Sequence, residues 1–170
     1  MNLCRRTLAL GLLGSSFGVR DVSAQQNVVF FRIGTGGHIG TYFPVGGLIA
    51  NAISNPPGSR ACSDGGSCGV PGMIATAVAT DGSAANVAAI ALGRMQSAFI
   101  QSDIAHWVHT GTGLYDGRPK VEKLRAIANL YPESVHVVAR KGSGISTIRD
   151  LKGKRVSLDE RGSGHWSTPV

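Results

Sequence analysis

The sequence has no long apolar run, and this absence excludes a stable membrane span. The apolar stretch near its start, residues 8–19, is too short and too broken by glycine to cross a bilayer. Positive charge at Arg5 and Arg6 precedes this stretch, and the small-residue sequence at residues 22–24 follows it. This order is typical of a secretory signal peptide with its cleavage site. We therefore expect residues 1–24 to be a signal peptide and the mature protein to be soluble and exported.

Cysteine is scarce. The chain has three cysteines, and export leaves only Cys62 and Cys68, in the sequence CSDGGSC. Zinc binding would need more ligands than this pair supplies, and none lie close in the sequence. The spacing also lacks the CxxC form of a redox motif. An oxidising compartment favours a disulfide between the two residues, and free thiols are the alternative.

Negative charge is also scarce. The chain has 10 acidic and 17 basic residues, and removal of residues 1–24 leaves 9 and 14, which is a net charge of +5. The basic residues are scattered, and the one cluster, at Lys152, Lys154 and Arg155, has no aromatic residues interleaved with it. This pattern disfavours a nucleic-acid-binding surface, so we expect no nucleic-acid partner. A positive surface would mildly attract anions.

The chain does contain a regular alternation of strand-like and helix-like segments. β-Branched and aromatic residues predict strands at residues 27–33, 73–80, 98–101, 124–130, 134–140 and 155–158. Helical spacing and strong helix formers predict helices at residues 42–54, 83–92 and 102–109, with one helical turn at 147–151. The apolar stripe of the first helix consists of Val45, Leu48, Ile49 and Ile53. The alternation predicts an α/β fold with a mainly parallel sheet.

A glycine-rich loop joins the first predicted strand to the first predicted helix, in the sequence FRIGTGGHIGTYF at residues 31–43. Glycines let backbone N–H groups approach a ligand closely, and the N-terminus of a helix adds partial positive charge. Such a loop suits an anion. A dinucleotide fingerprint is disfavoured, because Ile39 stands in its third glycine position and no acidic residue follows before Asp64. The alternative is that the glycines only make a tight turn.

Three further junctions between a strand and a helix carry small polar residues, at residues 81–86, 101–103 and 162–164. Ligands of open parallel sheets bind at the carboxyl ends of the strands, so the four junctions together predict a binding crevice. Ser83 and Asn86 could offer hydrogen bonds to a carboxylate there. The alternative for Ser83 is that it caps its helix, as we also expect Ser102 to do.

The sequence carries no clear signal for catalysis or for a metal centre. The GxSxG motif of a serine nucleophile is absent. Asp103, His106 and His109 lie roughly on one helix face, but exposed polar side chains are the favoured interpretation over a metal site. His38 could line the glycine loop, and Tyr131 could either reach a ligand or pack. We therefore expect a binding protein and not an enzyme.

Six motifs in order resemble the TAXI-type solute receptors of TRAP transporters, a branch of the periplasmic binding proteins. The resemblance covers nearly all of residues 25–164, and six motifs are far more specific than one glycine loop. The motifs are IGTGGHIGTYFPVGG at residues 33–47, CSDGGSCGVPG at 62–72, DGSAANVAAIALGR at 81–94, AFIQSD at 98–103, LYPESVHVV at 130–138 and DLKGKRVSLDERGSG at 150–164.

The resemblance implies a periplasmic-binding-protein type II-like fold, in which two α/β lobes close around a ligand. It implies a monomeric periplasmic receptor that binds a small carboxylate, such as glutamate or a dicarboxylate, and docks on the membrane subunits of a TRAP transporter. This function needs no cofactor, metal or catalytic residue. Matching motif positions carry over the ligand-binding residues Thr35, Gly36, Thr41, Tyr42, Ser83, Asn86, Gln101, Ser163 and Gly164.

Length is where the sequence departs from these receptors. Family members are considerably longer, and the match fails after Gly164, where HWSTPV replaces the start of a second lobe. We therefore expect residues 25–158 to form an incomplete first lobe. Residues 159–170 would begin the hinge and a truncated second lobe, so that the second lobe is largely missing. The alternatives are a receptor for an ABC importer, an exported hydrolase and a nonfunctional truncated remnant.

Overall fold

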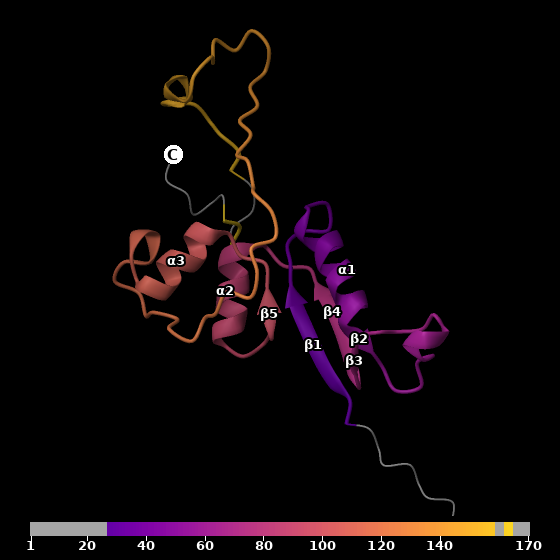
Figure 1. Ribbon diagram of the computed structural model, residues 1–170. Coiled ribbons are helices and arrows are strands. Elements are labelled where there is room, and N and C mark those ends of the chain that lie inside the picture. Colours follow the sequence, from indigo (N-terminus) through magenta and orange to yellow (C-terminus); the bar gives the residue numbers. More distant parts are fainter. Residues whose placement is uncertain (1–26, 159–161, 165–170) are drawn as a thin grey trace, which may run out of the picture.

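The computed structural model describes residues 27–158 and 162–164 (Figure 1). The predicted signal peptide and most of the predicted hinge segment lie outside the described residues. In chain order the elements are β1 (Val29–Gly34), α1 (Tyr42–Ile53), β2 (Ser54–Asn55), η1 (Cys62–Asp64), β3 (Val70–Pro71), β4 (Met73–Val78), α2 (Ser83–Ala91), β5 (Ser97–Ala98), α3 (Ser102–Thr110), η2 (Gly113–Tyr115) and η3 (Ile148–Leu151), where η marks a short 3-10 helix. Among these helices, none combines the length and the apolar character that a membrane span requires.

A parallel sheet with the strand order β4-β1-β5 forms the centre of the described chain. β1 pairs with β4 along its whole length, with Val29 opposite Met73 and Gly34 opposite Val78. β5 is short and pairs only with the end of β1. The β-branched and aromatic residues of β1 favour extended backbone, and the connections through α1 and α2 are long enough for parallel pairing. The predicted α/β fold with a parallel sheet is confirmed.

Two clusters of buried apolar residues hold the helices in place. The first lies between β1, α1 and the residue that follows β5, and consists of Ile33, Ala50 and Phe99. The second joins α2 to α3 and consists of Val87, Ile104 and Val108. Figure 1 shows the result, with α1 beside β1 and β4, and with α2 and α3 on the side of β5.

Helix α1 differs from its predicted apolar stripe at one position. Three residues of the stripe pack against the first cluster, but Leu48 is 71% exposed. The inward face is set by the buried residues Gly46 and Ala50. At Gly46 the helix comes so close to the sheet that a Cβ atom would lie 2.5 Å from Cγ2 of Thr35. Leu48 lies about 200° around the helix from Gly46 and therefore points away from the sheet.

The serine cap predicted for α3 is not formed, nor is the cap that was the alternative role of Ser83 in α2. The N-cap residues are Gly82 and Gln101, and neither makes a side-chain cap hydrogen bond. Ser83 and Ser102 are instead the first residues inside their helices. The hydroxyl of Ser83 accepts a hydrogen bond from the amide of Gln101, so it is bonded away from its own helix.

The three predicted strands after residue 123 are also absent, which corrects the assignments at 124–130, 134–140 and 155–158. Figure 1 shows this orange-to-yellow part of the chain extending away from the sheet as coil, with the predicted helical turn present as η3. Its apolar side chains are exposed, and Val138 is 92% exposed. A β-branched run becomes a strand only when a neighbouring strand completes its hydrogen bonds. No described strand lies beside these segments.

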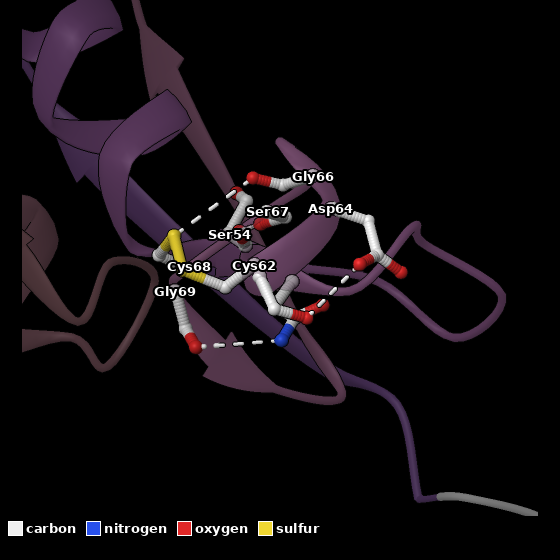
Figure 2. Close-up of a disulfide and its surroundings, with 9 residues drawn as sticks. Ser54, Cys62, Asp64, Gly66, Ser67, Cys68 and Gly69 are labelled. Carbon is white, nitrogen blue, oxygen red and sulfur yellow. Dashed lines mark hydrogen bonds between the residues drawn. A yellow bond between two sulfur atoms is a disulfide. The ribbon is translucent and has the colours of Figure 1, made fainter.

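A disulfide joins Cys62 to Cys68 in the loop between β2 and β3, with Cα atoms 4.7 Å apart (Figure 2). Beside it, the hydroxyl of Ser67 donates to the carbonyl of Ser54 at the end of α1. The hydroxyl of Ser54 in turn accepts from the amide of Ala75 in β4, at 2.8 Å. The disulfide loop therefore fastens the C-terminal end of α1 to the sheet.

Candidate functional site

The carboxyl ends of β1, β4 and β5 meet the N-termini of α1, α2 and α3 at one end of the sheet. This end, where the strands finish, is called the strand edge below. The chain passes from β1 to β4 on one side and then returns across β1 to β5 on the other. In open parallel sheets such a reversal opens a crevice where ligands bind. The sequence-assigned ligand residues all lie around this edge, namely Thr35, Gly36, Thr41, Tyr42, Ser83, Asn86, Gln101, Ser163 and Gly164.

Asn86 of α2 ties the residues that follow the three strands to one another. Its Nδ2 donates to the carbonyls of Thr35, at 2.6 Å, and Phe99, at 2.8 Å. Its Oδ1 lies 2.8 Å from the hydroxyl of Thr80, which donates to it. The Asn86 side chain is fully buried. It therefore acts on the position of the strand ends and has no exposed surface with which to contact a ligand.

Thr35 is fully buried as well and extends the pairing of β1 with β4 by one residue. Its hydroxyl donates to the carbonyl of Val78 at 2.7 Å, and its amide donates to the same carbonyl at 2.9 Å. The carbonyl of the neighbouring Gly36, also buried, accepts from the amide of Thr80 at 3.3 Å. These bonds hold the base of the glycine loop, while residues 37–41 are exposed.

Ser83 connects the start of α2 to the residue that precedes α3. Its buried hydroxyl accepts from the amide of Gln101 at 3.0 Å. The Oε1 atom of Gln101 is buried and accepts no hydrogen bond from the described residues. A buried acceptor without a donor costs about 1–3 kcal/mol.

The backbone at residues 162–164 covers the start of α2. The carbonyl of Gly162 accepts from the amides of Ala84, at 3.0 Å, and Ala85, at 3.3 Å. Ser163 is only 6% exposed, and Gly164 is buried. The first amides of a helix have no acceptor within it, and here the chain itself supplies one. The start of α2 is therefore closed to an anion.

The start of α1 is open by comparison. Thr41 is its N-cap residue, is exposed, and makes no side-chain cap hydrogen bond. The first turn contains no acidic residue. The first backbone bond runs from the amide of Val45 to the carbonyl of Thr41, and Pro44 has no N–H. The amides of Tyr42 and Phe43 therefore remain as donors at the positive end of the helix dipole.

Two tyrosines and a carboxylate gather beside the start of α1. The ring of Tyr42 lies against that of Phe99, with centroids 5.2 Å apart. Burial, followed by the carboxylate of Glu133, raises the pKa of the Tyr42 phenol far above its usual range, and the hydroxyl of Ser83 acts in the opposite direction. Burial and the same carboxylate also raise the pKa of Tyr131. The Glu133 carboxylate of the coil thus acts on two phenols beside the strand ends.

Tyr131, for which the sequence left packing and ligand contact open, packs against the first cluster. Its hydroxyl is nevertheless buried and has no hydrogen-bond partner among the described residues. The edge therefore holds two buried polar atoms in need of a partner, one from Tyr131 and one from Gln101.

The histidines do not contribute to this edge as a group. The ring of His38 lies edge-on to Phe43 at the rim of the glycine loop, with centroids 4.4 Å apart. His106 and His109 are exposed on α3, and the carboxylate of Asp103 accepts from the amide of Ile104. In the parts of the chain that the structure describes, no three His, Cys, Asp or Glu side chains are placed to hold a metal ion.

A hollow of about 490 Å³ lies at the other end of α1 and is lined by Asn51, Ala52, Gly66, Ser67 and Cys68. Figure 2 shows the last three of these residues at the disulfide. No charged side chain lines the hollow. The length of α1, about 18 Å for its 12 residues, separates it from the strand ends. The strand edge, with its amide donors and unpartnered polar atoms, is the better candidate site.

Two residues beside the strand ends were not predicted from the sequence as site residues, namely Thr80 and Glu133. Thr80 is the second residue after β4, and it lies inside the strand predicted at residues 73–80, so it was not considered as a site residue. Glu133 has no local signal, because its neighbours read as strand and loop. Only the path of the coil brings it to Tyr42.

A parallel α/β sheet whose strand ends meet helix starts at one polar end is the architecture of a periplasmic-binding-protein-like lobe. Comparison with known families identifies the particular one. The model of the NMT1-like family matches residues 33–168, so the chain belongs to the NMT1-like family, whose members are periplasmic substrate-binding domains.

Proposed function

We propose that the chain is the ligand-binding lobe of an exported periplasmic receptor for a small organic anion, with a carboxylate as the recognised group. The observation that carries this proposal is the uncapped start of α1. The amides of Tyr42 and Phe43 and the exposed hydroxyl of Thr41 are donors there, whereas the amides at the start of α2 are already bonded to Gly162. A carboxylate suits donors at the positive end of a helix dipole. The net positive charge of the chain favours its approach.

The number of donors limits the affinity. A charge-assisted hydrogen bond contributes about 1.5–3 kcal/mol, and micromolar binding needs about 8 kcal/mol after an association cost of several kcal/mol. Two amides and one hydroxyl on one wall do not reach that value. We therefore expect millimolar affinity from the described lobe and tighter binding where a second wall covers the ligand and excludes water.

The Thr41 hydroxyl provides the test of this site. We expect Thr41→Val, which keeps the shape of the side chain and removes the hydroxyl, to weaken L-glutamate binding about tenfold, since one charge-assisted bond is lost. Thr41→Ser keeps the hydroxyl and should bind as the wild type does. An NMR titration measures dissociation constants in this range. Equal affinity of the Val variant and the wild type would contradict the assignment.

We further propose that the receptor delivers its ligand to a TRAP transporter, on the strength of the six motifs alone. Reconstituted membrane subunits encoded beside this gene should then take up the ligand with an ion gradient and without ATP. An adjacent gene for a transport ATPase, and uptake that requires ATP, would instead support the ABC importer.

A further inference from the structure

The excess positive charge of the chain is concentrated in one segment, residues 140–158, which is called the basic arm below. The arm contains six basic residues and one acidic residue, whereas residues 27–139 contain seven basic and six acidic residues. The net charge is therefore +5 in the arm and only +1 in the longer range before it. The six basic side chains of the arm are all exposed, namely Arg140, Lys141, Arg149, Lys152, Lys154 and Arg155.

The basic arm stands apart from the sheet. Figure 1 shows this part of the chain extending away from the strands and from α1, α2 and α3. The one acidic residue of the arm, Asp150, is engaged within η3. Its carboxylate accepts hydrogen bonds from the amides of Ser146, at 2.9 Å, and Thr147, at 2.7 Å. The arm therefore presents a surface of mainly positive charge to the solvent.

Apolar side chains are exposed among these charges. Ile148 of η3 is 64% exposed, and Val156, the residue after Arg155, is 43% exposed. Val138, two residues before the arm, is 92% exposed. At an anionic membrane surface, basic side chains contact the lipid headgroups while apolar ones reach the boundary of the acyl chains. The arm offers both kinds of side chain on one exposed segment.

A nucleic acid fits the basic arm less well than a membrane does. Single strands are bound largely through aromatic side chains on which the bases stack, and the arm contains no phenylalanine, tyrosine or tryptophan. A duplex is read by a helix or a β-ribbon in its major groove. The helix that the structure describes in the arm, η3, has only four residues.

We propose that the basic arm is a docking surface for a membrane of anionic phospholipid. The inference is independent of the ligand that the strand edge binds. Segments with about four to eight lysine or arginine residues are typical of binding to anionic lipid, and each such residue near the surface strengthens binding about fivefold. The exposed Ile148 adds an apolar contribution that salt does not screen.

Co-sedimentation with lipid vesicles tests this proposal. The protein without residues 1–24 is used, because the apolar stretch there would itself bind lipid, and every described element lies within the remainder. We expect it to bind vesicles made of equal parts phosphatidylglycerol and phosphatidylcholine. Binding to pure phosphatidylcholine vesicles, or to the anionic vesicles at high salt, should be at least about tenfold weaker. The triple variant Lys152→Gln, Lys154→Gln, Arg155→Gln should bind the anionic vesicles about a hundredfold more weakly than the wild type.

The matched control is the triple variant Arg60→Gln, Arg94→Gln, Lys123→Gln. It removes the same charge from three exposed positions outside the arm, so it should bind within about threefold of the wild type, since distant charges are screened. Equal affinity of the two triple variants for anionic vesicles overturns the inference, as does equal affinity of the wild type for anionic and neutral vesicles.

Ile148→Ser tests the apolar part of the docking surface. It should weaken binding to anionic vesicles about tenfold, because an apolar side chain no longer enters the membrane boundary. Leu48→Ser removes an apolar side chain that is 71% exposed on α1, and it should leave vesicle binding unchanged. If the wild type does not bind anionic vesicles but does bind an oligonucleotide or an acidic protein, the inference is wrong and the arm serves that partner instead.

Discussion

At the scale of single residues, the buried polar side chains of the candidate site are bonded mainly to other groups of the protein. Thr35, Asn86 and Ser83 are at most 1% exposed, and their recorded hydrogen bonds run to backbone or side-chain groups of the protein. Their identity as small polar residues after strands or at helix starts could be predicted from the sequence. The direction of each side chain could not, because it depends on which carbonyl from a distant strand lies within reach.

Removal of the Asn86 side chain should therefore lower the stability of the protein more than its affinity for a ligand. Asn86→Ala removes the donor to the carbonyl of Phe99 and one of the two donors to the carbonyl of Thr35, which also accepts from the hydroxyl of Thr80, and each lost buried bond costs about 1–3 kcal/mol. We expect the free energy of unfolding to fall by about 2–4 kcal/mol. Urea denaturation followed by circular dichroism measures the change.

Asn51→Ala is the matched control, because Asn51 is exposed on α1 and a surface substitution usually changes stability by less than about 0.5 kcal/mol. Equal effects of the two substitutions would show that the network around Asn86 does not hold the strand ends together.

At the scale of elements, the local sequence pattern predicted the strands and helices that bury one face within the described lobe. β1, α1, β4, α2 and α3 form close to their predicted bounds, because strand formers meet strand partners and helical stripes meet the sheet. The predicted strands after residue 123 have equally favourable composition and do not form. A strand depends on a neighbour distant in sequence, and propensity alone does not supply one.

The close approach of α1 to the sheet gives a prediction with a built-in control. Gly46→Ala should destabilise the protein by about 1–3 kcal/mol, because the new Cβ atom would lie 2.5 Å from Cγ2 of Thr35. Gly47→Ala meets nothing within 4 Å and should stabilise α1 by about 0.5–1 kcal/mol, because alanine favours helix. Thermal unfolding of the two variants measures the difference. If both substitutions stabilise, α1 does not approach the sheet as described.

At the scale of the whole molecule, the described chain combines a parallel α/β lobe with a long exposed coil. The lobe was predictable from the alternation of strands and helices, and family membership follows from the match over residues 33–168. The contribution of the coil was not predictable. Its apolar residues, including Ile127 at 82% exposure and Val135 at 75%, predicted strands, while Tyr131 from the same coil packs against the cluster of Ile33, Ala50 and Phe99. Only the three-dimensional path of the chain separates these two roles.

The most direct measurement of where an anion binds is a titration of the ¹⁵N-labelled chain with L-glutamate, in which the shift of each backbone amide is followed. The amides of Tyr42 and Phe43 should shift most, because they lack acceptors at the start of α1. Those of Ala84 and Ala85, already bonded to Gly162, should shift little. Largest shifts at Ala84 and Ala85, or in the disulfide loop at residues 62–68, would contradict the placement of the site.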